Sequence, residues 1–159
     1  MRTPAIDHRA IIEQVLHAVG RGSSCWIPAE CGNSLPLQDR LAHELHSMGT
    51  RVVAVDLAGL SAQELPVMLL QSLGMTFDDS LQHANWQRFA EFVDGCRSSD
   101  KRLAFLWNAS LTSDDLAPTV YRVMQMTRRI AVQVLFGGED AGWEQLADQQ
   151  GMTFNSSLS

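Results

Sequence analysis

The chain alternates between segments in which apolar residues recur every three to four positions and shorter segments that are continuously apolar. Recurrence at three and four positions places apolar side chains on one face of a helix. The first such segment carries Ile11, Val15 and Val19 on one face and ends at Gly20, a residue type that commonly follows a helix. We predict helices over residues 6–19, 34–49, 61–73, 81–96, 113–126 and 141–149.

Two of these helices have recognisable capping residues. Ser61 is followed three positions later by Glu64, which is the spacing of a capping box. Thr112 or Ser113 is the predicted cap of the fifth helix, and the two aspartates that follow favour the positive end of its dipole. These residues predict where both helices begin.

The short apolar segments between the helices have the composition of strands. The segment 51–57 is rich in valine, a β-branched residue typical of strands, and 103–107 is continuously apolar. A strand that is covered on both faces has such an uninterrupted apolar run. We predict strands at 23–27, 51–57, 102–110 and 130–136, with a short edge strand at 152–154.

Strands that alternate with helices indicate parallel pairing through right-handed crossovers. The predicted fold class is therefore α/β, a three-layer sandwich with helices on both faces of a mostly parallel, five-stranded sheet. With 45% hydrophobic composition, residues 1–159 are expected to form a single domain. Ligands of such sheets bind beyond the carboxyl ends of the strands, which here are residues 28–34, 56–59, 108–110 and 137–140.

Charge and composition exclude several classes of protein. The formal net charge is -6 and the basic residues form no run, so we expect no nucleic-acid partner. No apolar stretch reaches the roughly 18 residues of a membrane span, and the first residues lack the pattern of a secretory signal. The three cysteines have no metal-like spacing and suit a reducing compartment. We therefore expect a cytoplasmic protein.

Residues 28–34 occupy the place of a phosphate-binding loop, directly after the first strand and before a helix. Such a loop needs a glycine-rich turn, a lysine for the terminal phosphates and a hydroxyl for magnesium. Gly32 and Ser34 stand at the matching spacing, but Asn33 replaces the lysine, and Glu30 adds a negative charge that repels phosphate. If a nucleotide is bound at all, we expect Gly32, Asn33 and Ser34 to contact it.

Asn108 ends the third strand, where P-loop proteins carry the aspartate that holds magnesium. Its carboxamide can hydrogen-bond a water molecule but does not anchor Mg²⁺ as a carboxylate does. Ala109 follows, so no glutamate is adjacent to activate a nucleophile. Together with the lost lysine, this predicts that ATP is not hydrolysed. We predict no catalytic residue and no cofactor, with Asn108 as a further contact only if nucleotide binds.

From about residue 8 to residue 149 the chain resembles the P-loop ATPase core of the secretion-associated AAA-type family, the ExeA type, and of related transposition-helper ATPases. The segments that carry the resemblance are the first helix, the loop at 28–34, "RLAFLWNASLTSDDL" and "VQVLFGGEDAGWEQLA". The resemblance implies a sheet with strand order 5-1-4-3-2. Gly138 falls where that family has a polar sensor residue, and we expect no counterpart of the family's C-terminal helical lid.

The last third of the chain also resembles SulA, the bacterial inhibitor of cell division. The segments "LAFLWNASLTSDDL" and "QGMTFNSSLS" carry this resemblance. SulA is a small P-loop-like domain without a working phosphate loop. Both resemblances imply a nucleotide-hydrolase fold that is used as a binding surface.

Three other features of the sequence are candidate sites: a histidine pair, a cysteine and a tryptophan. His43 and His46 have a spacing that suits metal ligands, but leucines define the opposite side of their helix, so we interpret them as a solvated face and predict no metal. Cys31 lies near a helix start, but the neighbouring acidic residue opposes a thiolate. Trp143 follows a glycine-rich turn and is the tryptophan we expect to be exposed, as a partner-binding residue.

The predicted function is a catalytically inactive P-loop-like domain, a pseudo-ATPase, that binds another protein as an interaction or regulatory module. The family resemblances imply partners in cell division or envelope assembly, and homodimerisation through a sheet edge is an alternative. The alternative function is a nucleotide-binding ATPase with a divergent loop, in which Asp56 or Asp114 contacts the metal.

Overall fold

A computed structural model describes residues 8–27, 35–77, 82–97, 102–109, 116–137, 141–149 and 153–154. The predicted helices and strands occur in the predicted order. They are α1 (His8–Gly20), β1 (Cys25–Ile27), α3 (Leu35–Ser47), β2 (Arg51–Asp56), α4 (Leu65–Ser72), α5 (Gln82–Cys96), β3 (Leu103–Asn108), α6 (Ala117–Met126), β4 (Ala131–Phe136), α7 (Ala141–Gln149) and β5 (Thr153–Phe154).

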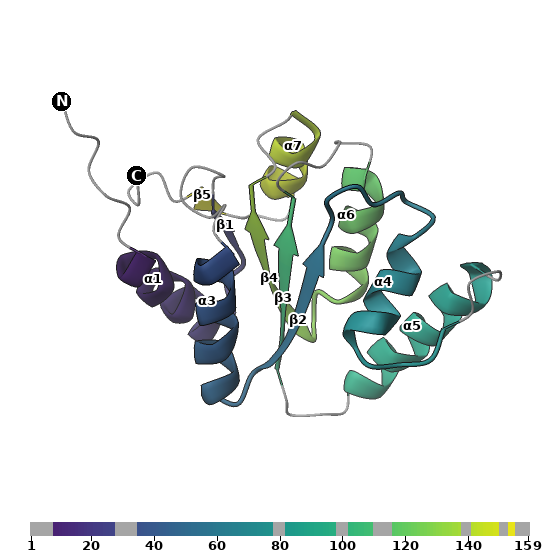
Figure 1. Cartoon of the computed structure of the whole chain (residues 1–159), viewed down its shortest axis with the longest axis horizontal. Helices are drawn as coiled ribbons and strands as arrows, with labels where there is room; N and C mark the ends of the chain where they lie inside the picture. Colours follow the sequence, from purple (N-terminus) through teal and green to yellow (C-terminus); the bar gives the residue numbers. More distant parts are fainter. Residues whose placement is uncertain are drawn as a thin grey trace.

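The five strands form one sheet in the order β2-β3-β4-β1-β5, and every pair is parallel. This confirms the α/β class, and the order is the one that the family resemblance implied. All strands therefore end at the same edge of the sheet, which is the upper edge in Figure 1. We call it the carboxyl edge, and the opposite edge the amino edge.

Helices cover both faces of the sheet, as the continuously apolar third strand predicted. In Figure 1, α1 and α3 lie on one side, and α4, α5 and α6 lie on the other. Alternate residues of β3 serve the two layers: Ala104 and Leu106 pack with α1 and α3, whereas Phe105 and Trp107 belong to the core on the other side. Because both faces are covered, every position from 103 to 107 is buried.

Two helices begin later than their predicted caps. The N-cap of α4 is Glu64, whose Oε1 accepts the Ser61 backbone N–H at 3.2 Å and the Ser61 hydroxyl at 2.7 Å. The Ser61–Glu64 contact therefore closes the turn before the helix. Leu116 is the N-cap of α6, and the predicted caps Thr112 and Ser113 lie outside the described residues. Both helices carry proline in the first turn, where a missing N–H costs no helix hydrogen bond.

No helix within the described ranges is long and apolar enough to cross a membrane.

Candidate functional site

The carboxyl edge of the sheet is held in a fixed register. Asp56 at the end of β2 pairs with Asn108 at the end of β3, and Asn108 pairs with Phe136 at the end of β4. Phe136 in turn pairs with Ile27, the last residue of β1. Backbone hydrogen bonds continue the sheet by one residue beyond three strand ends: Leu57 N to Asn108 O (3.0 Å), Ala109 N to Phe136 O (2.9 Å) and Gly137 N to Ile27 O (2.8 Å).

Asn108 lies at this edge on a central strand and is partly buried. The structure therefore places it where the sequence did, at the end of the strand that corresponds to the magnesium-holding strand of P-loop proteins. Its neutral carboxamide stands between an acidic residue on one neighbouring strand and an aromatic residue on the other. At the end of β3 the structure therefore has a neutral side chain, which binds Mg²⁺ less firmly than a carboxylate does.

Asp56 supplies a carboxylate at the side of the same edge. Its side chain is exposed, and its Oδ1 accepts the Ala58 backbone N–H at 3.0 Å, so the carboxylate closes the turn after β2. This turn continues through Gly59, which has a φ of 68° that glycine adopts readily. Asp56 is thereby oriented by its own turn while it remains accessible to solvent.

A tryptophan that the sequence analysis did not single out fixes the edge between β1 and β4. Trp26 Nε1 donates a buried hydrogen bond of 2.7 Å to the carbonyl oxygen of Gly137. The bond ties the strand before the loop at 28–34 to the residue that follows β4. The only signal in the sequence was the position of Trp26 directly before that loop, and its partner is 111 positions away.

The loop itself cannot be compared with its prediction, because Gly32, Asn33 and Ser34 lie outside the described residues. Its flanks are described and agree with the prediction. β1 ends at Ile27 and α3 begins at Leu35, so the segment connects a strand at the carboxyl edge to the start of a helix.

The exposure predicted for Trp143 is wrong. Its side chain is 0% exposed and belongs to the core between the sheet and the helices α4 to α7. The physical reason is that α7 packs against α6, which turns this face of the short helix inward. Its Nε1 has no hydrogen-bond partner within the described parts of the chain. Trp143 is therefore a core residue, and nothing in its position offers it to a partner.

The histidines His43 and His46 are exposed on α3, as predicted for a solvated face. Among the described residues there is no group of three or more metal-ligating side chains. The position of Cys31 lies outside the described ranges.

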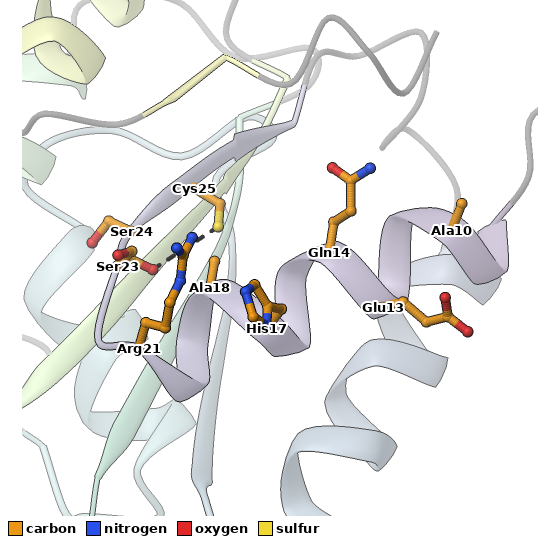
Figure 2. Close-up of a pocket in the computed structure, with 9 residues that line it drawn as sticks. All are labelled: Ala10, Glu13, Gln14, His17, Ala18, Arg21, Ser23, Ser24 and Cys25. Carbon is orange, nitrogen blue, oxygen red and sulfur yellow. Dashed lines mark hydrogen bonds between the residues drawn. The ribbon is translucent and has the colours of Figure 1, made fainter.

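A cavity of about 490 Å³ lies along α1 and the start of β1 (Figure 2). Its lining is mixed in charge and includes Glu13, His17, Arg21 and Cys25. Glu13 is engaged by Arg9 at 3.5 Å. Figure 2 shows the guanidinium of Arg21 beside the thiol of Cys25. The lining thus offers both an acidic and a basic group to a ligand and points to no single class of ligand.

The thiol of Cys25, which lines this cavity, makes the stability of the folded state depend on pH. Burial raises the pKa of the Cys25 thiol from 9.0 to about 11, and the nearby Arg21 lowers it in part. The folded state thus holds the thiol proton more tightly than the unfolded state, so stability is lost as the pH rises above 9. At pH 10 we expect a loss of about 1 kcal/mol. Urea unfolding between pH 8 and pH 10 should show it, and Cys25→Ala should flatten the profile. An equal slope in both proteins would contradict the assignment.

The order of the strands and the helices on both faces of the sheet define the fold. A parallel sheet in the order β2-β3-β4-β1-β5 is similar to that of P-loop domains of the AAA type. No protein-family model matches the chain, and no curated protein is similar to it in sequence.

Several solved structures share this fold. Cdc6p from Pyrobaculum aerophilum aligns with a TM-score of 0.64 and 14% identity, over 93% of this chain and 43% of that protein. A chain of the Drosophila ORC complex bound to AT-rich DNA and Cdc6 aligns with a TM-score of 0.61 and 9% identity, over 92% and 52%. The Aeropyrum pernix ORC2 protein aligns at 0.55 and 10% identity, over 92% and 45%. The chain thus has a P-loop, AAA-like fold and spans about half the length of these proteins.

Proposed function

We propose that this domain is a pseudo-ATPase, a P-loop-like module that does not hydrolyse nucleotide and acts by binding another protein. The observation that carries the proposal is Asn108, a neutral side chain at the carboxyl end of β3, in register with Asp56 and Phe136. Hydrolysis needs a carboxylate there to hold Mg²⁺ opposite the phosphates.

The sequence of the loop supports the same proposal. Asn33 stands where a lysine would neutralise the terminal phosphates, and Glu30 brings a negative charge close to them. Like charges at short range repel by several kcal/mol in the partly desolvated surroundings of a phosphate loop, at about 4 kcal/mol for 4 Å. The neutral Asn108 in the structure and the sequence of the loop both argue against a site for Mg-ATP.

The second candidate function is a nucleotide-binding ATPase with a divergent loop. The observation that favours it is the exposed carboxylate of Asp56, one strand away from Asn108 at the same edge. In this candidate, Gly32, Asn33 and Ser34 would contact ATP, and Asp56 or Asp114 would contact the metal.

Thermal unfolding with and without Mg-ATP separates the two candidates. A ligand present at 100 times its dissociation constant stabilises the folded state by about 2.7 kcal/mol. For the pseudo-ATPase we expect no shift of the unfolding temperature at millimolar Mg-ATP and no phosphate release above background. A shift that Asp56→Asn removes would support the divergent ATPase and would sink the first proposal. Glu44→Gln, a change of the same kind on α3, is the matched control.

The identity of the partner is a separate part of the proposal. The resemblances to secretion-associated ATPases and to SulA favour a protein of envelope assembly or of cell division. The net charge of -6 argues against the DNA that is bound by the Drosophila ORC complex. Homodimerisation is the alternative, since within the described residues β5 pairs with β1 at two positions and covers little of the edge of the sheet. Light scattering of the purified protein would reveal a dimer, and affinity capture from the native cell extract would reveal a different protein.

A further inference from the structure

Besides Arg21, which lies between α1 and β1, five arginines lie at the amino edge of the sheet. Arg51 begins β2, Arg102 directly precedes β3, and Arg128 with Arg129 lies between α6 and β4; Arg97 follows α5. The amino edge is the lower edge in Figure 1. Helices that run antiparallel to the strands end at this edge. Helix carboxyl ends carry partial negative charge, so arginines at this edge can cap helices.

Two of them do. Arg102 Nη1 donates to the carbonyl oxygens of Val19 (3.1 Å) and Gly20 (3.4 Å) at the end of α1. Arg51 Nη2 donates to the carbonyl oxygen of Leu73 (3.2 Å) at the end of α4, and its guanidinium also lies over the ring of Phe92. Both side chains are therefore part of the fold.

The other three line a concavity of about 460 Å³, together with Gln125, Met126 and Ile130. Arg128 and Arg129 are exposed, and within the described part of the chain neither guanidinium forms an ion pair or bonds a helix carbonyl. Arg97 is 3.5 Å from Asp94, but the Arg97 side chain is 62% exposed, so this pair is weak. We call this concavity the arginine pocket.

Arginine charges that face one concavity repel one another unless an anion lies between them. Guanidinium groups bind carboxylates through two parallel hydrogen bonds, and three of them can hold more than one acidic group. The buried Ile130 and the partly buried Met126 also line the pocket, so one part of its surface is apolar. Its chemistry therefore fits carboxylates that are close to an apolar side chain.

We propose that the arginine pocket binds a short acidic segment of a partner protein. A nucleic acid is a poorer fit, because its charge extends far beyond three arginines and the whole chain carries a net charge of -6. A short peptide segment carries a few carboxylates close together. It can bind the three arginines without extending over the acidic rest of the surface. The inference rests on the proposed function in one respect, that the domain acts by binding a protein.

Fluorescence anisotropy of a labelled peptide of alternating glutamate and leucine, at low salt, tests the proposal directly. We expect saturable binding that weakens as salt is added, since exposed charges are screened. The double variant Arg128→Glu with Arg129→Glu should weaken binding by about tenfold or more. The control variant Arg9→Glu with Arg40→Glu makes the same charge change on exposed positions of α1 and α3 and should bind as the unmodified protein does.

Three results would contradict the proposal that the arginine pocket binds an acidic segment. They are the absence of peptide binding, equal losses of affinity in both double variants, and tighter binding of a single-stranded oligonucleotide than of the peptide. Thermal unfolding of both variants checks that these exposed changes leave the fold intact. If affinity capture yields a partner that the variant Arg128→Glu with Arg129→Glu still binds, the proposal for the arginine pocket is wrong and the proposed function stands. If Mg-ATP is hydrolysed, the proposed function fails independently of the peptide result.

Discussion

Trp107→Ala is expected to lower the free energy of unfolding by about 3–5 kcal/mol, which is the usual cost of deleting a large buried aromatic side chain. Trp107 is 0% exposed on β3, which lies between β2 and β4, and its ring stacks on Phe105 with 5.5 Å between centroids. Alanine would leave a cavity between the sheet and α6 that the surrounding layers cannot close. For a chain of this length, each kcal/mol lowers the unfolding temperature by about 2–4 °C. Calorimetry or urea unfolding measures the loss.

Trp86→Ala is the matched control for this prediction. Trp86 lies on α5, is only partly buried, and makes an edge contact with Phe89 and a cation–π contact with Arg122. Because part of its surface already meets water, its truncation should cost clearly less than that of Trp107. Equal losses would mean that the centre of the sheet is not the main source of stability.

Gln133→Leu is expected to cost about 1–3 kcal/mol, although it replaces a polar residue in the core by an apolar one. Gln133 is 3% exposed, accepts the Trp107 Nε1–H at 2.7 Å and donates to the Thr127 hydroxyl at 2.8 Å. Leucine would leave the Trp107 N–H buried without an acceptor. Thr127 is affected less, because its hydroxyl donates to the Val123 carbonyl oxygen at 2.9 Å.

A double-mutant cycle tests this explanation more sharply than the single variant does. Trp107→Phe removes the donor, so Gln133→Leu added to it no longer orphans an N–H. The double variant should therefore lose clearly less stability than the sum of the two single variants, as measured by urea unfolding. Strict additivity would show that the hydrogen bond between Trp107 and Gln133 does not couple them.

The secondary structure was readable from the sequence because burial follows a local period. The spacing of Ile11, Val15 and Val19 predicted α1, and all three are buried on one face of it. The continuously apolar segment at 103–107 predicted a strand covered on both sides, and the structure confirms it. The strand order was not contained in these patterns. The family resemblance implied an order, and the observed order is the same.

The start of α4 and the environment of Trp143 were predicted incorrectly for a common reason. The Ser61–Glu64 spacing fits a capping box, but the same contact can close a turn. The helix starts at Leu65, four residues after Ser61, and Glu64 is its N-cap. Trp143 follows a glycine-rich turn, which suggested exposure, but the packing of α7 on α6 buries it. Local patterns permit both outcomes in each case, and packing chooses between them.

The sequence by itself determined the helices, the strands, the layered class and the absence of both the loop lysine and the aspartate at position 108, because these depend on neighbouring residues. Three features were decided only by the tertiary structure. Trp26 donates a hydrogen bond to Gly137 at the carboxyl edge, the buried side chain of Gln133 has hydrogen-bond partners, and three arginines line one pocket. The partners in these contacts lie far apart along the chain, 111 positions for Trp26 and Gly137 and 26 for Trp107 and Gln133. Such contacts form only when strands and helices pack, so no local spacing records them.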